Sequence, residues 1–248
     1  MKDWPYPLWI AHRGAGKLAP ENTLAAFRLG AQHGYRAFEC DVKLSADGVP
    51  FLLHDATLQR TTSGRGLAAQ HTWAALSQLD AGSWHSRTYA GEPLPSLQAV
   101  ARFCLRNGFA LNIEIKPTPG TEADTGREVA LAAARWWDCA APPLLSSFQP
   151  GALAAARESA PHLPRALLLD GLRAGWLAEA RALGCVAVVA DYPSLDAAVI
   201  DQLHAADMRA MSYTVNDPFT AQRLIGLGID GLITDAVDRF SAASGQVD

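Results

Sequence analysis

Short apolar segments alternate along this chain with alanine- and leucine-rich segments that have the period of a helix. Such an alternation is typical of parallel strands joined by crossover helices, so it predicts an α/β fold. The nine predicted strands are Leu8–Ala11, Ala37–Leu44, Val49–Leu53, Leu111–Ile115, Leu144–Phe148, Arg165–Leu169, Val186–Ala190, Ala210–Val215 and Gly231–Thr234. A first helix is capped near Thr23 and stopped by Gly34, and the later ones are Leu97–Asn107, Thr125–Asp138, Pro150–Ser159, Arg173–Leu183, Leu195–Ala205 and Pro218–Leu227.

Two connections depart from this alternation. Residues 45–48 contain an Asp-Gly turn signal and are too few to hold a helix, so one of the nine strands is expected to be a hairpin arm. Residues 55–95 are rich in Gly, Ser, Thr and Trp, which indicates an insertion after the strand that ends at His54. Eight βα units in a single domain, residues 1–248, predict a (β/α)8 TIM barrel, with an open doubly wound sheet as the alternative. In a barrel, the functional residues lie at the carboxyl ends of the strands.

Charge and apolar content argue against several classes of protein. The 248 residues include 21 Lys and Arg against 25 Asp and Glu, a net charge of −4, and no basic run predicts binding to nucleic acid. Apolar runs such as Val129–Ala134 are far shorter than the roughly 18–20 residues of a membrane span, and the first residues lack a signal-peptide core. We therefore expect a cytoplasmic protein without stable membrane association. Its four cysteines are expected to be reduced and buried, at Cys40, Cys104, Cys139 and Cys185.

Two histidines stand at the ends of predicted strands. The first strand runs into His12, Arg13 and Gly14. Histidine acts as an acid or a base near neutral pH, and the planar donors of arginine suit a phosphate group. Glycine lets the backbone approach a ligand closely. His54 ends the expected hairpin arm, opposite the region of Asp41, and the next residue is an aspartate that can orient its ring. Two imidazoles at one mouth predict an acid–base pair, whereas a purely structural histidine is the alternative for each.

Three acidic residues also fall on predicted strands. Glu39 and Asp41 are two residues apart, so both carboxylates lie on one face, and Glu114 and Lys116 repeat this spacing on another strand. Adjacent negative charges repel, and on a face turned to the barrel interior they need a positive partner, for which a hard divalent cation is the simplest candidate. For each acid taken alone, a solvated strand end or an ion pair with lysine remains the alternative.

The candidate residues belong to a larger set of ordered sequence blocks. These are His12-Arg13-Gly14, Pro20-Glu21-Asn22-Thr23, Glu39-x-Asp41, His54-Asp55, Leu79 to Trp84, Glu114-Ile115-Lys116, Thr214-Val215-Asn216 and Thr234-Asp235. Over about residues 8–240 the set resembles the glycerophosphodiester phosphodiesterase family of phospholipase-C-like barrels, and it looks most like the cytoplasmic bacterial members. Tyr213 departs from the pattern, because many relatives have Trp at that position.

The resemblance implies a reaction and a set of residues for it. The reaction is hydrolysis of a small-molecule glycerophosphodiester to sn-glycerol 3-phosphate and an alcohol, with one divalent metal ion. All-oxygen ligands suit Mg²⁺ or Ca²⁺, with Mn²⁺ as a further option. The implied residues are Glu39, Asp41 and Glu114 as metal ligands, His12 and His54 as the acid–base pair, and Arg13 and Lys116 as phosphate-binding groups.

Two other functions are compatible with the same barrel. One is a lyase that releases a cyclic phosphate or acts on lysophospholipids, and the other is a non-catalytic barrel that binds glycerophosphodiesters. A barrel that only binds would be expected to have lost a histidine or a carboxylate, and none is missing from this chain. The sequence alone indicates neither the oligomeric state nor which histidine is the base.

Overall fold

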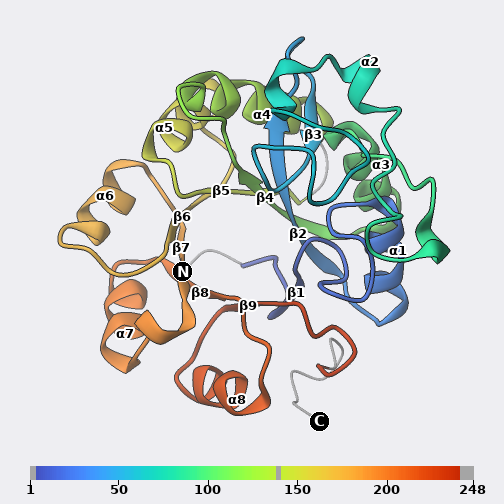
Figure 1. The fold of residues 1–248 in the computed structure, drawn as a ribbon. Coiled ribbons are helices and arrows are strands. Elements are labelled where there is room, and N and C mark those ends of the chain that lie inside the picture. The colour runs from blue at the N-terminus through green and yellow to red at the C-terminus, as the bar shows by residue number, and fades with distance from the viewer. Residues whose placement is uncertain (1–3, 138–140, 241–248) are drawn as a thin grey trace.

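Eight parallel strands close into a barrel in the computed structural model, which describes residues 4–137 and 141–240. The sheet order is β1-β9-β8-β7-β6-β5-β4-β2, and the pairing of β1 with β2 completes the ring (Figure 1). The barrel strands are β1 (Trp9–Ala11), β2 (Ala37–Leu44), β4 (Ala110–Ile115), β5 (Leu144–Ser147), β6 (Arg165–Leu169), β7 (Ala187–Asp191), β8 (Arg209–Tyr213) and β9 (Gly231–Thr234). The closed ring confirms the TIM barrel and excludes the open sheet.

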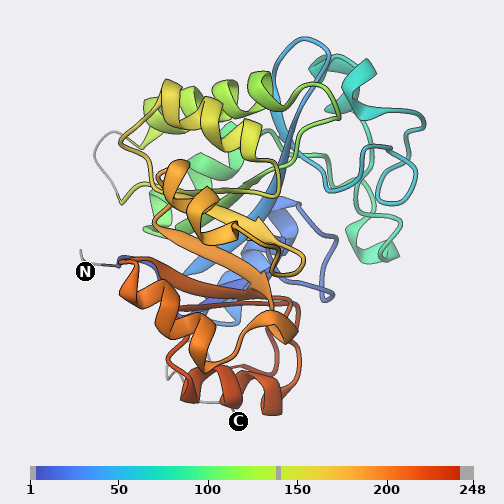
Figure 2. The ribbon, with the colours of Figure 1, turned by 90° about the vertical axis from the view of Figure 1, so that its left-hand side faces the viewer.

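The main helices pack around the outside of this ring (Figures 1 and 2). They are α1 (Leu24–Gln32), α3 (Leu97–Asn107), α4 (Glu122–Trp136), α5 (Pro150–Ser159), α6 (Trp176–Ala182), α7 (Ala197–Ala205) and α8 (Pro218–Gly226). Helix α6 begins later than expected because Gly175 adopts a left-handed conformation, with φ of 81°, immediately before it. In the described part of the chain, no helix combines the length and the apolar character needed to cross a membrane.

The ninth strand and the insertion lie beside the mouth of the barrel. Strand β3 (Pro50–Leu52) pairs antiparallel with β2, which confirms the hairpin. The following segment contains α2 (Trp73–Leu76) and is more than a loop, because it packs around a small apolar core of its own. That core consists of Phe51, Leu53, Leu58, Ala68, Leu76, Ala81 and Leu94. Figure 2 shows the insertion and the first described residues, which precede β1, at opposite ends of the barrel.

The cysteine prediction concerns four thiols. Cys40, Cys104 and Cys185 are free and buried, as expected. Burial raises the pKa of all three thiols, which is typical of unreactive cysteines. The fourth, Cys139, lies outside the described residues.

The interior of the barrel changes from apolar to polar toward its mouth. An apolar cluster that includes Ile10, Leu144 and Leu168 fills the lower interior, separate from the larger cluster between strands and helices. Because side chains on a strand alternate between its two faces, the next interior positions after Ile10 and Leu144 are those of His12 and Ser146. The site at the mouth therefore stands directly on an apolar floor.

Helices α4 and α5 approach each other so closely that a glycine is needed between them. A Cβ atom at Gly126 in α4 would lie 2.1 Å from the carbonyl oxygen of Ala152 in α5. Side chains cannot relieve such an overlap with backbone, so a larger residue has to move the helices apart.

We predict that Gly126→Ala lowers the free energy of unfolding by about 1–3 kcal/mol, the usual effect of overpacking, although alanine favours helix formation. The matched control is Gly226→Ala in α8, where an added Cβ meets nothing within 4 Å. The control is expected to be neutral or to stabilise the protein by up to about 1 kcal/mol. Urea unfolding followed by circular dichroism measures both, and a Gly126→Ala protein as stable as wild type would contradict the prediction.

Candidate active site

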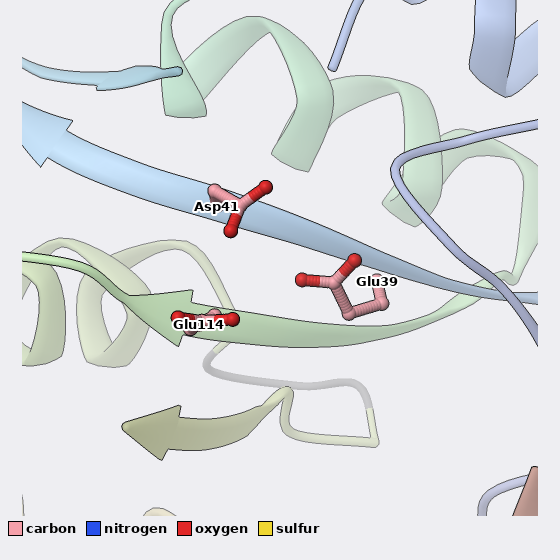
Figure 3. A group of neighbouring side chains, drawn as sticks. All are labelled: Glu39, Asp41 and Glu114. Atoms are coloured by element: carbon pink, nitrogen blue, oxygen red, sulfur yellow. The ribbon is translucent and has the colours of Figure 1, made fainter. Parts of the chain in front are cut away.

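Three buried carboxylates lie together at the mouth of the barrel (Figure 3). Glu39 and Asp41 project from β2 and Glu114 from β4, where Asp41 and Glu114 are paired in register. One ligand oxygen from each residue lies within 4.8 Å of the other two, and the three residues are only 1–9% exposed. The structure thus brings together the acids that the strand spacing had placed on one face.

The crowding of these carboxylates shifts their pKa values. Burial, together with the nearby charges of Asp41 and Glu114, raises the pKa of Glu39 well above its usual range. Burial and the charge of Asp41 raise the pKa of Glu114 to about 7. Asp41 behaves differently, because Arg13 and Lys116 outweigh its burial and hold its pKa well below the usual range.

Two cations neutralise part of this negative charge. Arg13 Nε lies 3.2 Å from Asp41 Oδ2, whereas Lys116 Nζ lies 2.8 Å from Glu114 Oε1 and 3.5 Å from Asp41 Oδ1. Within the described residues, Glu39 Oε1 and Asp41 Oδ1 are buried and have no hydrogen-bond partner. Buried carboxylate oxygens without donors are suitable ligands for a hard divalent cation, so the residues fit the metal that the sequence suggested.

Each of the two histidines has its Nδ1 atom held by an aspartate. His12 Nδ1 lies 2.6 Å from Asp235 Oδ1, and His54 Nδ1 lies 2.7 Å from Asp55 Oδ1. A carboxylate accepts a hydrogen bond, so Nδ1 is the donor and Nε2 is left for the site. Arg13 Nε donates to His12 Nε2 at 3.2 Å, which agrees with that tautomer. Burial is the main cause that lowers the pKa of His54.

Two cavities meet at these groups. The inner cavity, about 310 Å³, is lined by both His12 and His54 and reaches down to Leu168 and Ile233 on the barrel floor. The outer cavity, about 460 Å³, extends past His54 toward Thr57, at the start of the insertion, and toward the segment after β4. All seven candidate residues from the sequence are therefore gathered at one place, as the carboxylate contacts and the inner cavity show.

Phe148 and Tyr213 form walls of these cavities, whereas Trp84 does not. Phe148 lines both, and Lys116 Nζ stands 5.8 Å from the centre of its ring. Trp84 lines neither cavity and is 40% exposed, with its indole nitrogen donating to the carbonyl of Ala81 within the insertion. Tyr213 lines the inner cavity, and its hydroxyl donates to the carbonyl of Leu169.

Supporting residues that sequence reasoning did not assign complete the site. Asn22 donates to Asp41 Oδ2 at 2.8 Å and accepts from the backbone of the same aspartate at 3.1 Å. Arg60 joins Asp55 to Glu21 through four hydrogen bonds of 2.6–3.0 Å. Asn22, Glu21 and Asp235 stood within recognisable sequence blocks, but nothing around Arg60 indicated its role.

Comparisons with known proteins agree on one family. A sequence model of the glycerophosphoryl diester phosphodiesterase family matches residues 12–239. A glycerophosphodiester phosphodiesterase of Caldanaerobacter subterraneus is 33% identical over 233 residues, which are 92% of this chain and 93% of the relative. A phosphodiesterase of Oleispira antarctica, solved in complex with the product sn-glycerol-3-phosphate, has 34% identity and a TM-score of 0.86, with 93% of this chain and 94% of that chain covered. The structure of a glycerophosphodiester phosphodiesterase of Agrobacterium tumefaciens has 28% identity and a TM-score of 0.81. This match covers 96% of this chain and 100% of that chain.

The TIM barrel, the charged groups at its mouth and the named relatives together define the class of protein, an enzyme that acts on phosphodiesters. Within that class, the chain belongs to the glycerophosphodiester phosphodiesterase family. The family resemblance of the sequence is thereby confirmed.

We predict that Mg²⁺ or Ca²⁺ raises the thermal unfolding midpoint of the metal-depleted protein, and more so near pH 8 than near pH 6. The raised pKa of Glu114, about 7, means that the fold without cation loses stability as this group deprotonates with rising pH. A cation reverses that loss, whereas at low pH it must first displace the proton. Glu114→Gln should reduce the metal-induced increase, and an equal increase at both pH values would argue against binding at this carboxylate.

Proposed function

We propose that this enzyme hydrolyses glycerophosphodiesters to sn-glycerol 3-phosphate and an alcohol, with a divalent cation and with His12 and His54 as the acid–base pair. The observation that carries the proposal is that both imidazoles, each held by an aspartate at Nδ1, line the same cavity as Glu39 and Glu114 of the carboxylate cluster. A binding barrel has no need for two oriented imidazoles at one site. The structure of the Oleispira relative with sn-glycerol-3-phosphate supports the same choice of product.

The phosphodiester group carries a negative charge that must be neutralised before an oxygen can attack phosphorus. Arg13 and Lys116 supply fixed positive charge on opposite sides of Asp41, at 3.2 and 3.5 Å from its two oxygens. The guanidinium of Arg13 is suited to two parallel contacts with phosphate oxygens, and Lys116 can follow the same group as a point charge. Both side chains are mostly buried, which strengthens their interaction with an anion.

A divalent cation fits the remaining negative charge. Glu39, Asp41 and Glu114 would hold it, and Mg²⁺ and Ca²⁺ both accept such an all-oxygen set. When bound, the cation would supply neutralising charge and lower the pKa of a hydroxyl group at the site. The set has no sulfur or nitrogen ligand, which argues against a preference for softer metals.

The histidines move the protons of the reaction. In the tautomer that the aspartates impose, Nε2 of a neutral ring accepts a proton from the attacking hydroxyl, and Nε2 of a protonated ring donates one to the departing alcohol. The carboxylate behind each ring stabilises its charged form during this exchange, as Asp235 does for His12 and Asp55 for His54. The same arrangement serves attack by the glycerol 2-hydroxyl, which gives a cyclic phosphate that water opens, and direct attack by water.

We predict that His12→Ala and His54→Ala each lower kcat for glycerophosphocholine at least ~100-fold, the usual effect of losing a general acid or base. His33→Ala is the matched control, because this exposed imidazole lies at the end of α1, away from the mouth. Release of glycerol 3-phosphate measures the rate, and circular dichroism checks the fold. A variant of His12 or His54 that keeps near-wild-type activity removes that residue from the mechanism.

We predict that chelation abolishes turnover and that added Mg²⁺, Ca²⁺ or Mn²⁺ restores it. The buried carboxylates repel the anionic substrate as well as one another unless a cation balances them. ³¹P NMR of the reaction should show sn-glycerol 3-phosphate as the end product. Undiminished hydrolysis by a metal-free sample would refute the cation, and a cyclic phosphate that accumulates as end product would define a lyase instead.

A further inference from the structure

The inner and outer cavities differ in what they can hold. They share His54, Glu114, Lys116 and Phe148, so a phosphate bound among the charged groups would lie between them. The inner cavity is closed below by the apolar floor of the barrel. The outer cavity is larger and extends toward the insertion. A substrate therefore has one end in a space of fixed size and the other end in a space that tolerates variation.

Among the described residues, two neutral polar side chains of the inner cavity have no hydrogen-bond partner. Asn112 on β4 is 4% exposed and Ser146 on β5 is fully buried. Within residues 4–137 and 141–240, neither the two amide atoms of Asn112 nor the hydroxyl of Ser146 has a hydrogen-bond partner. Buried polar groups are normally paired, and leaving them unpaired destabilises a fold. Three unpaired atoms that line one cavity are typical of a place where a ligand completes the hydrogen bonds.

The chemistry of these atoms selects the ligand. An asparagine amide offers both a donor and an acceptor, and a serine hydroxyl offers both as well. A neutral hydroxyl group satisfies this combination, whereas a charged group would lack an opposite charge on the floor formed by Leu168 and Ile233. Of the two sides of a glycerophosphodiester, only the glycerol side is small, constant in size and provided with free hydroxyl groups.

We propose that Asn112 and Ser146 bind the terminal hydroxyl of the glycerol moiety and make the enzyme specific for substrates in which that hydroxyl is free. This inference rests on the proposed function and adds the part of the substrate that the site recognises. An acyl chain on the terminal hydroxyl would enter a cavity closed by the barrel floor and would leave the three polar atoms unpaired. Lysophospholipids acylated at this position are therefore poor substrates. This argues against activity on lysophospholipids, which the sequence had left open.

The test compares glycerophosphocholine with 2-hydroxypropyl phosphocholine, which lacks only the terminal hydroxyl, and with lysophosphatidylcholine. Wild-type enzyme should prefer glycerophosphocholine over the deoxy analogue roughly 10- to 100-fold in kcat/KM, the range expected when buried polar groups lose a partner. It should show the lowest activity on lysophosphatidylcholine. Because this comparison uses the unaltered protein, it does not depend on the folding of any variant.

Variants then assign the preference to residues. Ser146→Ala and Asn112→Leu should lower kcat/KM for glycerophosphocholine about 10-fold, while the rate for the deoxy analogue stays within about twofold. Ser212→Ala is the matched control, since this serine is equally buried but its hydroxyl already donates to the carbonyl of Ala190 at 3.1 Å. The control should keep the wild-type preference. Ser146→Ala should not lower the thermal unfolding midpoint, because it removes a hydroxyl that has no hydrogen-bond partner in the described part of the chain.

Three outcomes would overturn the inference. One is a wild-type enzyme that hydrolyses the deoxy analogue as efficiently as glycerophosphocholine. Another is a loss of kcat/KM in the variants that is equal for both substrates and that a higher Mg²⁺ concentration restores. Such a result would assign Asn112 and Ser146 to the cation site. The third is efficient hydrolysis of lysophosphatidylcholine. In all three the enzyme still hydrolyses glycerophosphodiesters, whereas no activity on any of them would overturn the proposed function itself.

Discussion

The repulsion between three buried carboxylates is the constraint on which the site depends. Glu39, Asp41 and Glu114 are fixed by the register of two adjacent strands, so the backbone holds them together although their charges oppose it. Arg13, Lys116 and the amide of Asn22 each contact one of these carboxylates and offset part of this charge. The barrel supplies the rigidity that such an arrangement needs, because its strands are tied on both sides.

A second layer of charge joins the insertion to the barrel. Arg60 in the insertion bridges Asp55, which orients His54, and Glu21, which in turn binds Arg13. The insertion makes two further contacts with this part of the chain, through its Glu92 at the start of α1 and its His85 at the loop after β1. The small apolar core of the insertion thus holds a loop that positions one imidazole and one guanidinium at the same time.

Local periodicity explains what could be predicted from the sequence. Strand spacing alone placed Glu39 and Asp41 on one face, because a strand repeats every two residues whatever its surroundings. Asp235 contacts His12 across 223 positions of sequence, and no local pattern reports on such a contact. Arg60 was missed for a related reason, since an arginine in a polar loop is indistinguishable from a solvated one until its carboxylate partners are known. The unpaired state of Asn112 likewise follows from packing around the residue, not from its identity.

The division between charged and neutral groups shows how such a site can be both strong and selective. Arginine, lysine and a divalent cation attract any phosphodiester, so they contribute affinity for the anion without distinguishing what is attached to it. Discrimination has to come from groups that lie beyond the phosphate and lose a hydrogen bond when the wrong substrate is present. In this barrel those positions are the first polar ones above the apolar floor, where Asn112 and Ser146 line a cavity of about 310 Å³ that ends at Leu168 and Ile233. The open outer cavity imposes no comparable requirement. An enzyme built in this way therefore recognises the glycerol moiety, which all its substrates share, and accepts different alcohol groups.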